Sequence, residues 1–366
     1  MANNASKHNP LWTMLIPSIA IVILGIYASN TQFFGIVALL TIGLVGSVVA
    51  AVHHAEVIAH RVGEPFGTLV LALAVTIIEV ALIVSMMMSG GDATMGLARD
   101  TIFAAVMIIL NGIIGASLLL GARKHLVQDF SLEGVTAALG TMTVIVTFAL
   151  ILPSFSTTAP GPVYTSKQLM FVAIMTLVLF AAFTFFQTVR HRDYFLPVVQ
   201  ETDLGNIDSH AQPPSNKDVG ISFVFLLLSL VAVVLSAKGI SPSLEKVLTA
   251  VGAPAATLGI IIAAIVLMPE FGAALRAARA NRLQTSLNLA IGSAIASIGL
   301  TIPVVAIVAI VMDWPLELGL DAKSITLLVL SLFVVSNSLR TGRTTSLPGV
   351  VHLVIFAAYL FFSFAP

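Results

Sequence analysis

Two glutamates stand inside long apolar segments of the chain. Glu79 lies in LVLALAVTIIEVALIV, and Glu270 lies in LGIIIAAIVLMPEFGAAL. A charged side chain at the centre of a bilayer costs roughly 3 kcal/mol by insertion scales, so such residues usually face a cavity or a partner. Burial raises the pKa of a carboxyl group, whereas a nearby cation lowers it. A glutamate in a narrow cavity can therefore hold a proton or a metal ion, which compete for the same oxygens.

This competition predicts exchange of a cation against protons. Two glutamates supply two negative charges, which suits a hard divalent cation such as Ca²⁺ with its oxygen ligands. Pro269 removes a backbone hydrogen bond and frees a carbonyl of the preceding turn. The residues alone do not distinguish Ca²⁺ from Na⁺ or K⁺. A structural hydrogen bond is the plain alternative for each glutamate, and Glu270 could also lie near a helix end.

A second polar group contains two histidines and two glutamates. His53, Glu56 and His60 are spaced for one face of a helix, and Glu64 follows just before Pro65. We expect either a solvated helix end or an entrance for protons and cations, because histidine titrates near neutral pH. Two histidines and a carboxylate could also bind zinc. Glu64 could instead cap the next helix.

The composition shows which solvent surrounds these residues. Of 366 residues, 58% are hydrophobic and only 9% are charged, against about 25% in soluble domains. This small number of charges cannot cover a surface that faces water. Lipid must therefore surround most of the protein surface. Lys+Arg and Asp+Glu balance at 17 each, which gives no indication of nucleic-acid binding. The chain has no cysteine, which excludes thiol chemistry. We expect no enzyme activity and no bound cofactor.

The predicted fold is an all-α polytopic membrane protein with about eleven transmembrane helices. A membrane helix needs about 20 apolar residues. The apolar segments run over 12–29, 34–53, 66–88, 101–121, 135–153, 168–189, 220–237, 250–273, 286–312, 323–340 and 348–365. The polar interval 190–219 is predicted to be a linker.

The distribution of Lys and Arg predicts the orientation of these helices. One side carries twelve of these residues and the other carries five. The richer side should face the cytoplasm. This places the N-terminus and the linker inside and the C-terminus outside. A stripe of three arginines, Arg276, Arg279 and Arg282, is expected to anchor the cytoplasmic interface.

The helices after the first divide into two groups of five. The expected organisation is 1–30 for the tail and first helix, 31–189 for one repeat, 190–219 for the linker and 220–366 for a second repeat. Because five is odd, the second repeat must have the opposite polarity. Glu79 lies fourteen residues after Pro65, and Glu270 lies sixteen after Pro254. Inverted repeats of this kind place a transport site at the membrane midplane.

Two stretches resemble a known family. The segment 269–303, PEFGAALRAARANRLQTSLNLAIGSAIASIGLTIP, resembles the second signature repeat of the calcium/proton exchangers in the calcium/cation antiporter superfamily. The segment 55–80, AEVIAHRVGEPFGTLVLALAVTIIEV, resembles their first repeat. With the C-terminal GRTTSLPGVVHLVIFAAYL, nearly the whole chain is similar to bacterial ChaA-type cation/proton antiporters.

The resemblance implies a site, a substrate class and a location. Glu79 and Glu270 would bind the cation or the proton, with a supporting polar shell of Thr76, Asn111, Ser293 and Ser297. Many members carry Gly-Asn before each glutamate, where this chain has Val75-Thr76 and Val266-Leu267. The implied partners are Ca²⁺, Na⁺ or K⁺ and protons, in a bacterial inner membrane. The alternatives are a monovalent cation/proton antiporter without Ca²⁺ transport, a cation channel, an intramembrane metalloenzyme and an organic-solute carrier.

Overall fold

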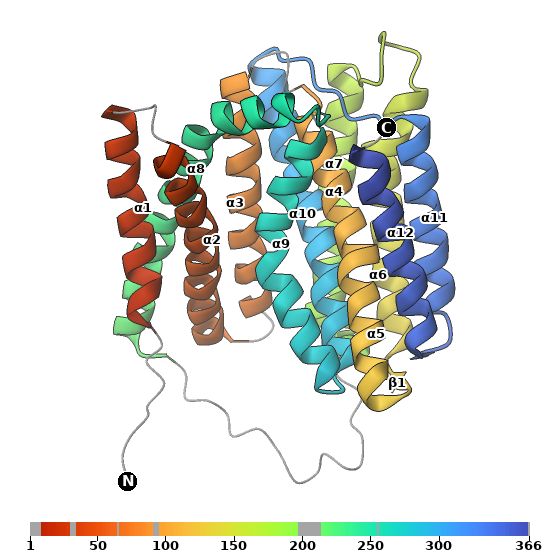
Figure 1. Ribbon diagram of the computed structural model, residues 1–366. Helices are drawn as coiled ribbons and strands as arrows, with labels where there is room; N and C mark the ends of the chain where they lie inside the picture. Colours follow the sequence, from red (N-terminus) through yellow and green to blue (C-terminus); the bar gives the residue numbers. More distant parts are fainter. Residues whose placement is uncertain are drawn as a thin grey trace, which may run out of the picture. The chain divides into compact units, whose positions relative to one another are not determined.

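The computed structural model describes residues 9–29, 34–63, 66–90, 95–196, 214–254 and 256–364 (Figure 1). Helices dominate this part of the chain. The α-helices are α1 Leu11–Ser29, α2 Phe34–Val62, α3 Phe66–Gly90, α4 Leu97–Met107, α5 Ile114–His125, α6 Leu132–Val146, α7 Ser166–Phe185, α8 Asn216–Ala250, α9 Ala256–Arg279, α10 Leu283–Val311, α11 Ala322–Ser338 and α12 Ser346–Phe364. Short π- and 3₁₀-helical segments are η2 Ile108–Ile113, η3 Thr147–Ile151, η4 Leu152–Phe155, η5 Phe186–Arg190 and η6 Arg192–Phe195.

These elements confirm the predicted fold class. Within the described residues, nine helical segments are long and apolar enough to cross a membrane, and two shorter apolar helices accompany them. Segments α4, η2 and α5 form one continuous span, as do α6 with η3 and η4, and α7 with η5. The only strands in the described ranges are β1 Gln128–Asp129 and β2 Arg343–Thr344, which pair antiparallel with Gln128 opposite Thr344.

Several helices extend past their predicted ends. Helix α2 continues to Val62, and α8 runs from Asn216 to Ala250 with Pro242 inside it. A capping box of Ser215 and Asp218 begins α8 inside the expected linker. Polar residues are tolerated in these extensions because a helix that leaves the hydrocarbon keeps its backbone hydrogen bonds in water. Of the expected linker, 197–213 lie outside the described residues.

The chain divides into two compact units. Unit 1 comprises 1–90 and 205–252, and unit 2 comprises 91–204 and 253–366. Helices α1, α2, α3 and α8 pack together in unit 1. There His54 of α2 makes a 3.3 Å contact from Nε2 to the carbonyl oxygen of Thr13, and its ring stacks on Phe225 of α8. Arg61 donates to Asn216 at 2.7 Å. Each unit thus contains helices from both predicted halves.

The span 97–125 is the core of unit 2. It is 83% buried over its most apolar window, and it packs against α9, α10 and α12. Small residues bring α12 close to it: a Cβ added at Gly349 would lie 2.5 Å from the Leu119 nitrogen and 2.7 Å from the Gly115 oxygen. Between membrane helices, where lipid is as apolar as a side chain, such close contact is a main source of association.

Replacement of Gly349 by alanine tests this contact. The added methyl group has no space beside the backbone of α5, so α12 must move away. We expect a loss of about 1–3 kcal/mol in the free energy of unfolding, measured by denaturation of the purified protein in detergent. Gly140→Ala is the matched control, because a Cβ there meets no atom within 4 Å. Equal stability of the two variants would contradict the close packing of α5 and α12.

Candidate functional site

Glu79 lies well inside α3 of unit 1. Its side chain is only 3% exposed, and α3 continues to Gly90. Thr76 lies three residues earlier on the same helix face and is also buried. The Thr76 hydroxyl donates to the carbonyl oxygen of Ala72 at 2.9 Å. The hydroxyl oxygen can still accept a hydrogen bond or contact a cation, because this bond uses only its proton.

Glu270 lies within α9 of unit 2 and is 7% exposed. The helix passes through Pro269 without a break and continues to Arg279, so the helix-end alternative for Glu270 is wrong. Helix α9 packs against α10, which carries Ser293 and Ser297 one turn apart. Ser297 is buried and Ser293 is half-buried. Both glutamates thus stand in mid-helix, out of water, each in its own unit.

Asn111 joins three helical segments in the interior of unit 2. It lies in the π-helical segment η2 and is fully buried. Its Nδ2 donates to Ser331 Oγ of α11 at 2.8 Å, and its Oδ1 lies 3.1 Å from His352 Nδ1 of α12. π-Helical turns are rare and often occur at functional sites.

The hydrogen bonds of this network have a fixed direction. Ser331 donates its hydroxyl proton to the Leu327 carbonyl oxygen at 2.7 Å, so its oxygen accepts from the Asn111 amide nitrogen. Asn111 Oδ1 must then accept from Nδ1–H of His352, which assigns the tautomer of that ring. Both polar atoms of the Asn111 amide are used within this network. The structure shows the Asn111 amide holding η2, α11 and α12 together. Its predicted place in the cation shell stays a prediction.

The sequence analysis missed Ser331 and His352 as partners of Asn111. Their signal was a lone polar residue within an apolar span, in LLVLSLFVV and in GVVHLVIF. A second buried pair, Ser286 and Ser117, is linked by a 3.0 Å hydrogen bond between α10 and α5. These buried polar groups are thus paired across helices, where lipid offers no other partner.

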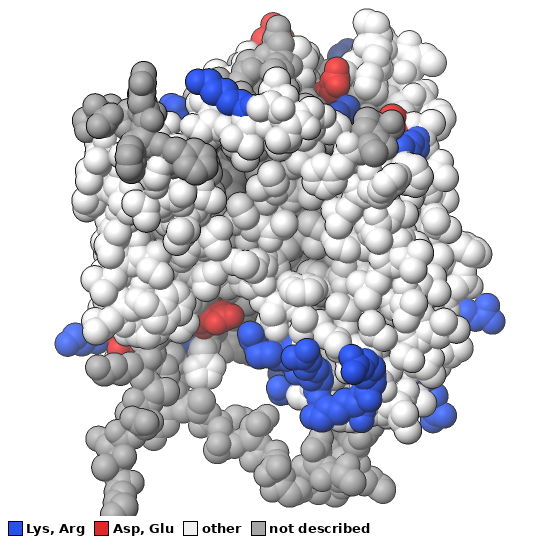
Figure 2. Space-filling view, viewed as in Figure 1, with Lys and Arg blue, Asp and Glu red and all other residues white. Residues whose placement is uncertain are grey.

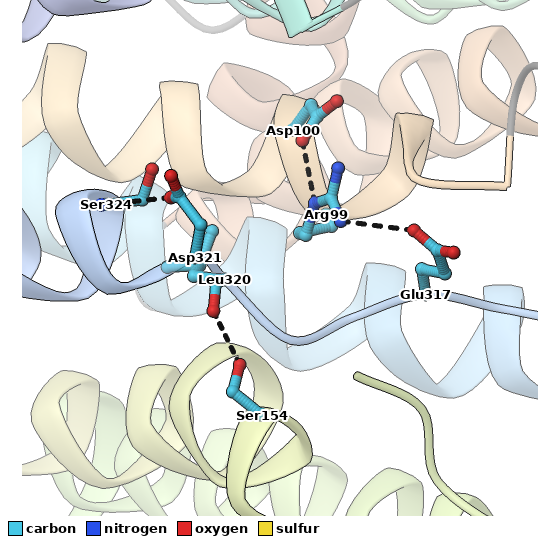
Figure 3. A network of polar contacts seen from close by, with 7 residues as sticks. All are labelled: Arg99, Asp100, Ser154, Glu317, Leu320, Asp321 and Ser324. Atoms are coloured by element: carbon cyan, nitrogen blue, oxygen red, sulfur yellow. Dashed lines mark hydrogen bonds and ion pairs between the residues drawn. The ribbon is translucent and has the colours of Figure 1, made fainter. Parts of the chain in front are cut away.

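A charged network lies at the start of α4 (Figure 3). Arg99 donates from Nε to Asp100 Oδ1 at 2.8 Å and from Nη1 to Glu317 Oε2 at 3.3 Å. Asp321 caps α11 by accepting from the Ser324 amide at 3.0 Å. A cavity of about 300 Å³ in unit 2 has Arg99, Asp100 and Asp321 in its wall. This cluster could not be predicted from the sequence, because Arg99 lies 218 residues from Glu317 along the chain.

The predicted entrance residues lie at the end of α2. His53 is half-buried with its ring 5.9 Å from that of Trp12, whereas Glu56 and His60 are exposed. Glu64 lies outside the described residues. Across the ranges that the structure describes, no three His, Cys, Asp or Glu side chains come together to hold a metal. The zinc alternative for His53, Glu56 and His60 is therefore wrong, and their role as an entrance stays a prediction.

Comparisons with known proteins give three findings. A family model described as sodium/calcium exchanger protein matches residues 32–189 and 221–365. The chain is 43% identical to the protein y4hA of Sinorhizobium fredii, over 99% of this chain and 98% of that protein. It is 36% identical to the sodium-potassium/proton antiporter ChaA of Escherichia coli, over 96% of both. The fold is similar to the crystal structure of the H⁺/Ca²⁺ exchanger CAX, with a TM-score of 0.72, 16% identity and coverage of 98% and 89%.

Replacement of Asn111 by alanine tests the buried network. The change leaves Ser331 and His352 without the amide that joins them, so we expect a loss of about 1–2 kcal/mol in the free energy of unfolding. Asn337→Ala is the control, because that exposed side chain bonds only within its own helix, to Phe333. Unfolding in detergent measures both. If the two variants lose the same stability, the network does not hold these helices together.

Proposed function

The chain belongs to the sodium/calcium exchanger protein family, and on that premise we propose that it is an antiporter that moves cations across a membrane in exchange for protons. The observation that supports this most is the pair of glutamates buried in mid-helix, Glu79 and Glu270. The two stretches that the family model matches coincide with the two predicted halves, which supports one glutamate per repeat. We propose that transport, and not catalysis, is the activity of this chain.

The proposed mechanism uses each carboxylate twice. When deprotonated, Glu79 and Glu270 bind the cation through their oxygens. When the cation has left, the same oxygens take up protons, because an uncompensated charge out of water is unfavourable. The protein then alternates between states open to either side, and protons that enter down their gradient drive the cation out. Thr76, Asn111, Ser293 and Ser297 supply further oxygens in this proposal, and Asn111 also holds η2, α11 and α12 together.

The first candidate for the cation is Ca²⁺, with Na⁺ or K⁺ carried as well. Two carboxylates match a divalent charge, and a carbonyl left free before Pro269 adds a hard oxygen ligand. The fold of the H⁺/Ca²⁺ exchanger CAX is consistent with this. The second candidate is exchange of Na⁺ or K⁺ alone, which the 36% identity to the sodium-potassium/proton antiporter ChaA favours.

The entrance and the location follow from the same proposal. The exposed Glu56 and His60 at the end of α2 would gather protons and cations on the cytoplasmic side, a role that we also propose for His53 and Glu64. The bacterial antiporter ChaA supports a place in the inner membrane. The uneven distribution of Lys and Arg supports a cytoplasmic N-terminus and an outer C-terminus.

Replacement of either buried glutamate by glutamine is expected to abolish exchange. Glutamine keeps the shape but can neither titrate nor supply a negative charge, so Glu79→Gln and Glu270→Gln should each reduce transport at least about ten-fold. Proton flux in inverted vesicles, with Ca²⁺, Na⁺ and K⁺ titrated separately, measures the loss and ranks the cations. Glu133→Gln, at an exposed position, is the matched control. Wild-type flux in both buried variants would exclude this site.

Cation affinity should fall as the pH is lowered. Protons and cations compete for the same carboxylates, so the apparent Kd for the cation rises with proton concentration, and binding releases protons. Calorimetry of the purified protein in buffers of different ionisation heat measures both effects without an ion gradient. Glu270→Gln should release fewer protons than Glu133→Gln. A Kd independent of pH would contradict shared oxygens.

A further inference from the structure

Lys and Arg side chains gather at one end of unit 2, where α5 and α9 end (Figures 1 and 2). All of them are exposed: Arg123, Lys124, Arg276, Arg279, Arg282, Arg340 and Arg343. Among the described residues, only Arg343 of this group has a carboxylate within 4 Å, at 3.0 Å from Asp129. We call this group the basic end. The described residues thus leave most of this charge without a neighbouring carboxylate.

Hydrogen bonds between the loop after α5 and the end of α9 hold the backbone of the basic end in one arrangement. Lys124 Nζ donates to the carbonyl oxygen of Arg279 at 3.2 Å, and His125 lies 3.0 Å from the same oxygen, which joins the ends of α5 and α9. The fully buried Gln128 donates to the Ala278 carbonyl at 2.9 Å and to Asn281 Oδ1 at 3.0 Å. The turn between α9 and α10, which carries Arg282, is therefore fixed against the loop after α5.

An apolar tip projects from the same loop. Leu126 is 80% exposed and Val127 is 46% exposed. Leu126 also has a φ of 63°, in the left-handed region that a leucine rarely adopts. The loop is tied down by Gln128 on one side and the end of α5 on the other, which keeps the leucine outward. An outward apolar side chain amid cations is typical of a surface within the headgroup layer of a membrane.

We propose that the basic end binds the phosphate of an anionic phospholipid on the predicted cytoplasmic side. Arg276, Arg279 and Arg282 would face the phosphate from α9 and its turn, Arg123 and Lys124 would face it from α5, and Leu126 would contact the acyl chains. A guanidinium group can donate two parallel hydrogen bonds to a phosphate, and the backbone that carries these arginines is held in place before the lipid arrives. Topology control requires only an excess of Lys and Arg on one side. Topology control does not require a fixed scaffold or an exposed leucine. A lipid-binding site explains both features. This inference is independent of the proposed ion exchange.

Lipid titration of the purified full-length protein tests the proposal. Native mass spectrometry in a neutral detergent would compare the apparent Kd for phosphatidylglycerol with that for phosphatidylcholine. We expect the wild type to prefer phosphatidylglycerol. In the triple variant Arg276→Gln, Arg279→Gln, Arg282→Gln, affinity should fall about five-fold for each removed charge, or about 100-fold in total. Leu126→Asn should weaken binding of the lipid and leave binding of inorganic phosphate unchanged.

The matched control removes the same charge elsewhere. Lys167, Lys238 and Lys246 are exposed and belong to the predicted outer side, and their triple change to glutamine should leave the lipid Kd unchanged. Equal affinity of the wild type for the two lipids would overturn the proposal without any variant. Equal losses in the two triple variants would overturn it as well, and so would inorganic phosphate binding as tightly as the lipid. Because no ion gradient is used, none of these outcomes affects the proposed exchange.

Discussion

A polar group inside these helices gains from a partner within the protein, because a bilayer offers no water to replace a missing one. This constraint accounts for much of the arrangement of unit 2. Ser331, Asn111 and His352 come from three helical segments and form one directed series of hydrogen bonds. The close approach at Gly349 brings α12 near enough to α5 for that series to form. A buried carboxyl group meets the same constraint when it is protonated or when a cation balances its charge.

The helices could be predicted from the sequence, whereas many of their contacts could not. An apolar run of about 20 residues has few alternatives to a membrane helix, so the span order holds from α1 to α12. Helix ends such as Val62 were missed, because residues beyond the hydrocarbon need no apolar side chain. The partners of Asn111 are 220 and 241 positions away along the chain, and periodicity in one helix carries no information on such pairs.

The candidate site, too, could be predicted from the sequence only in part. Burial of Glu79 and Glu270 followed from their apolar surroundings, and the structure confirms it for both. Their joint action on one ion stays a prediction, which derives from the resemblance and from the matched halves. Asn111 was placed in the cation shell from its position alone, and only the coordinates show that its amide is bound to other side chains. The loop with Leu126 and Gln128 had no signal in the sequence beyond a change to polar residues.

The π-helical segment η2 has a consequence for how related chains can vary in length. An α-helix has 3.6 residues per turn, so residues spaced by four drift around its axis. The wider turn over 108–113 reduces this drift, so residues before and after it face the same neighbour, α12. Phe103 contacts Tyr359, Asn111 contacts His352, and Gly115 lies close to Gly349. Loss of one residue there would restore a plain α-helix and leave the residues after it close to their present phase, because the π-turn is the place where one extra residue is accommodated. Evolution can therefore change the length of this span by one residue at η2 and keep the face that meets α12, whereas the same change elsewhere in the span would rotate the following residues by about 100°.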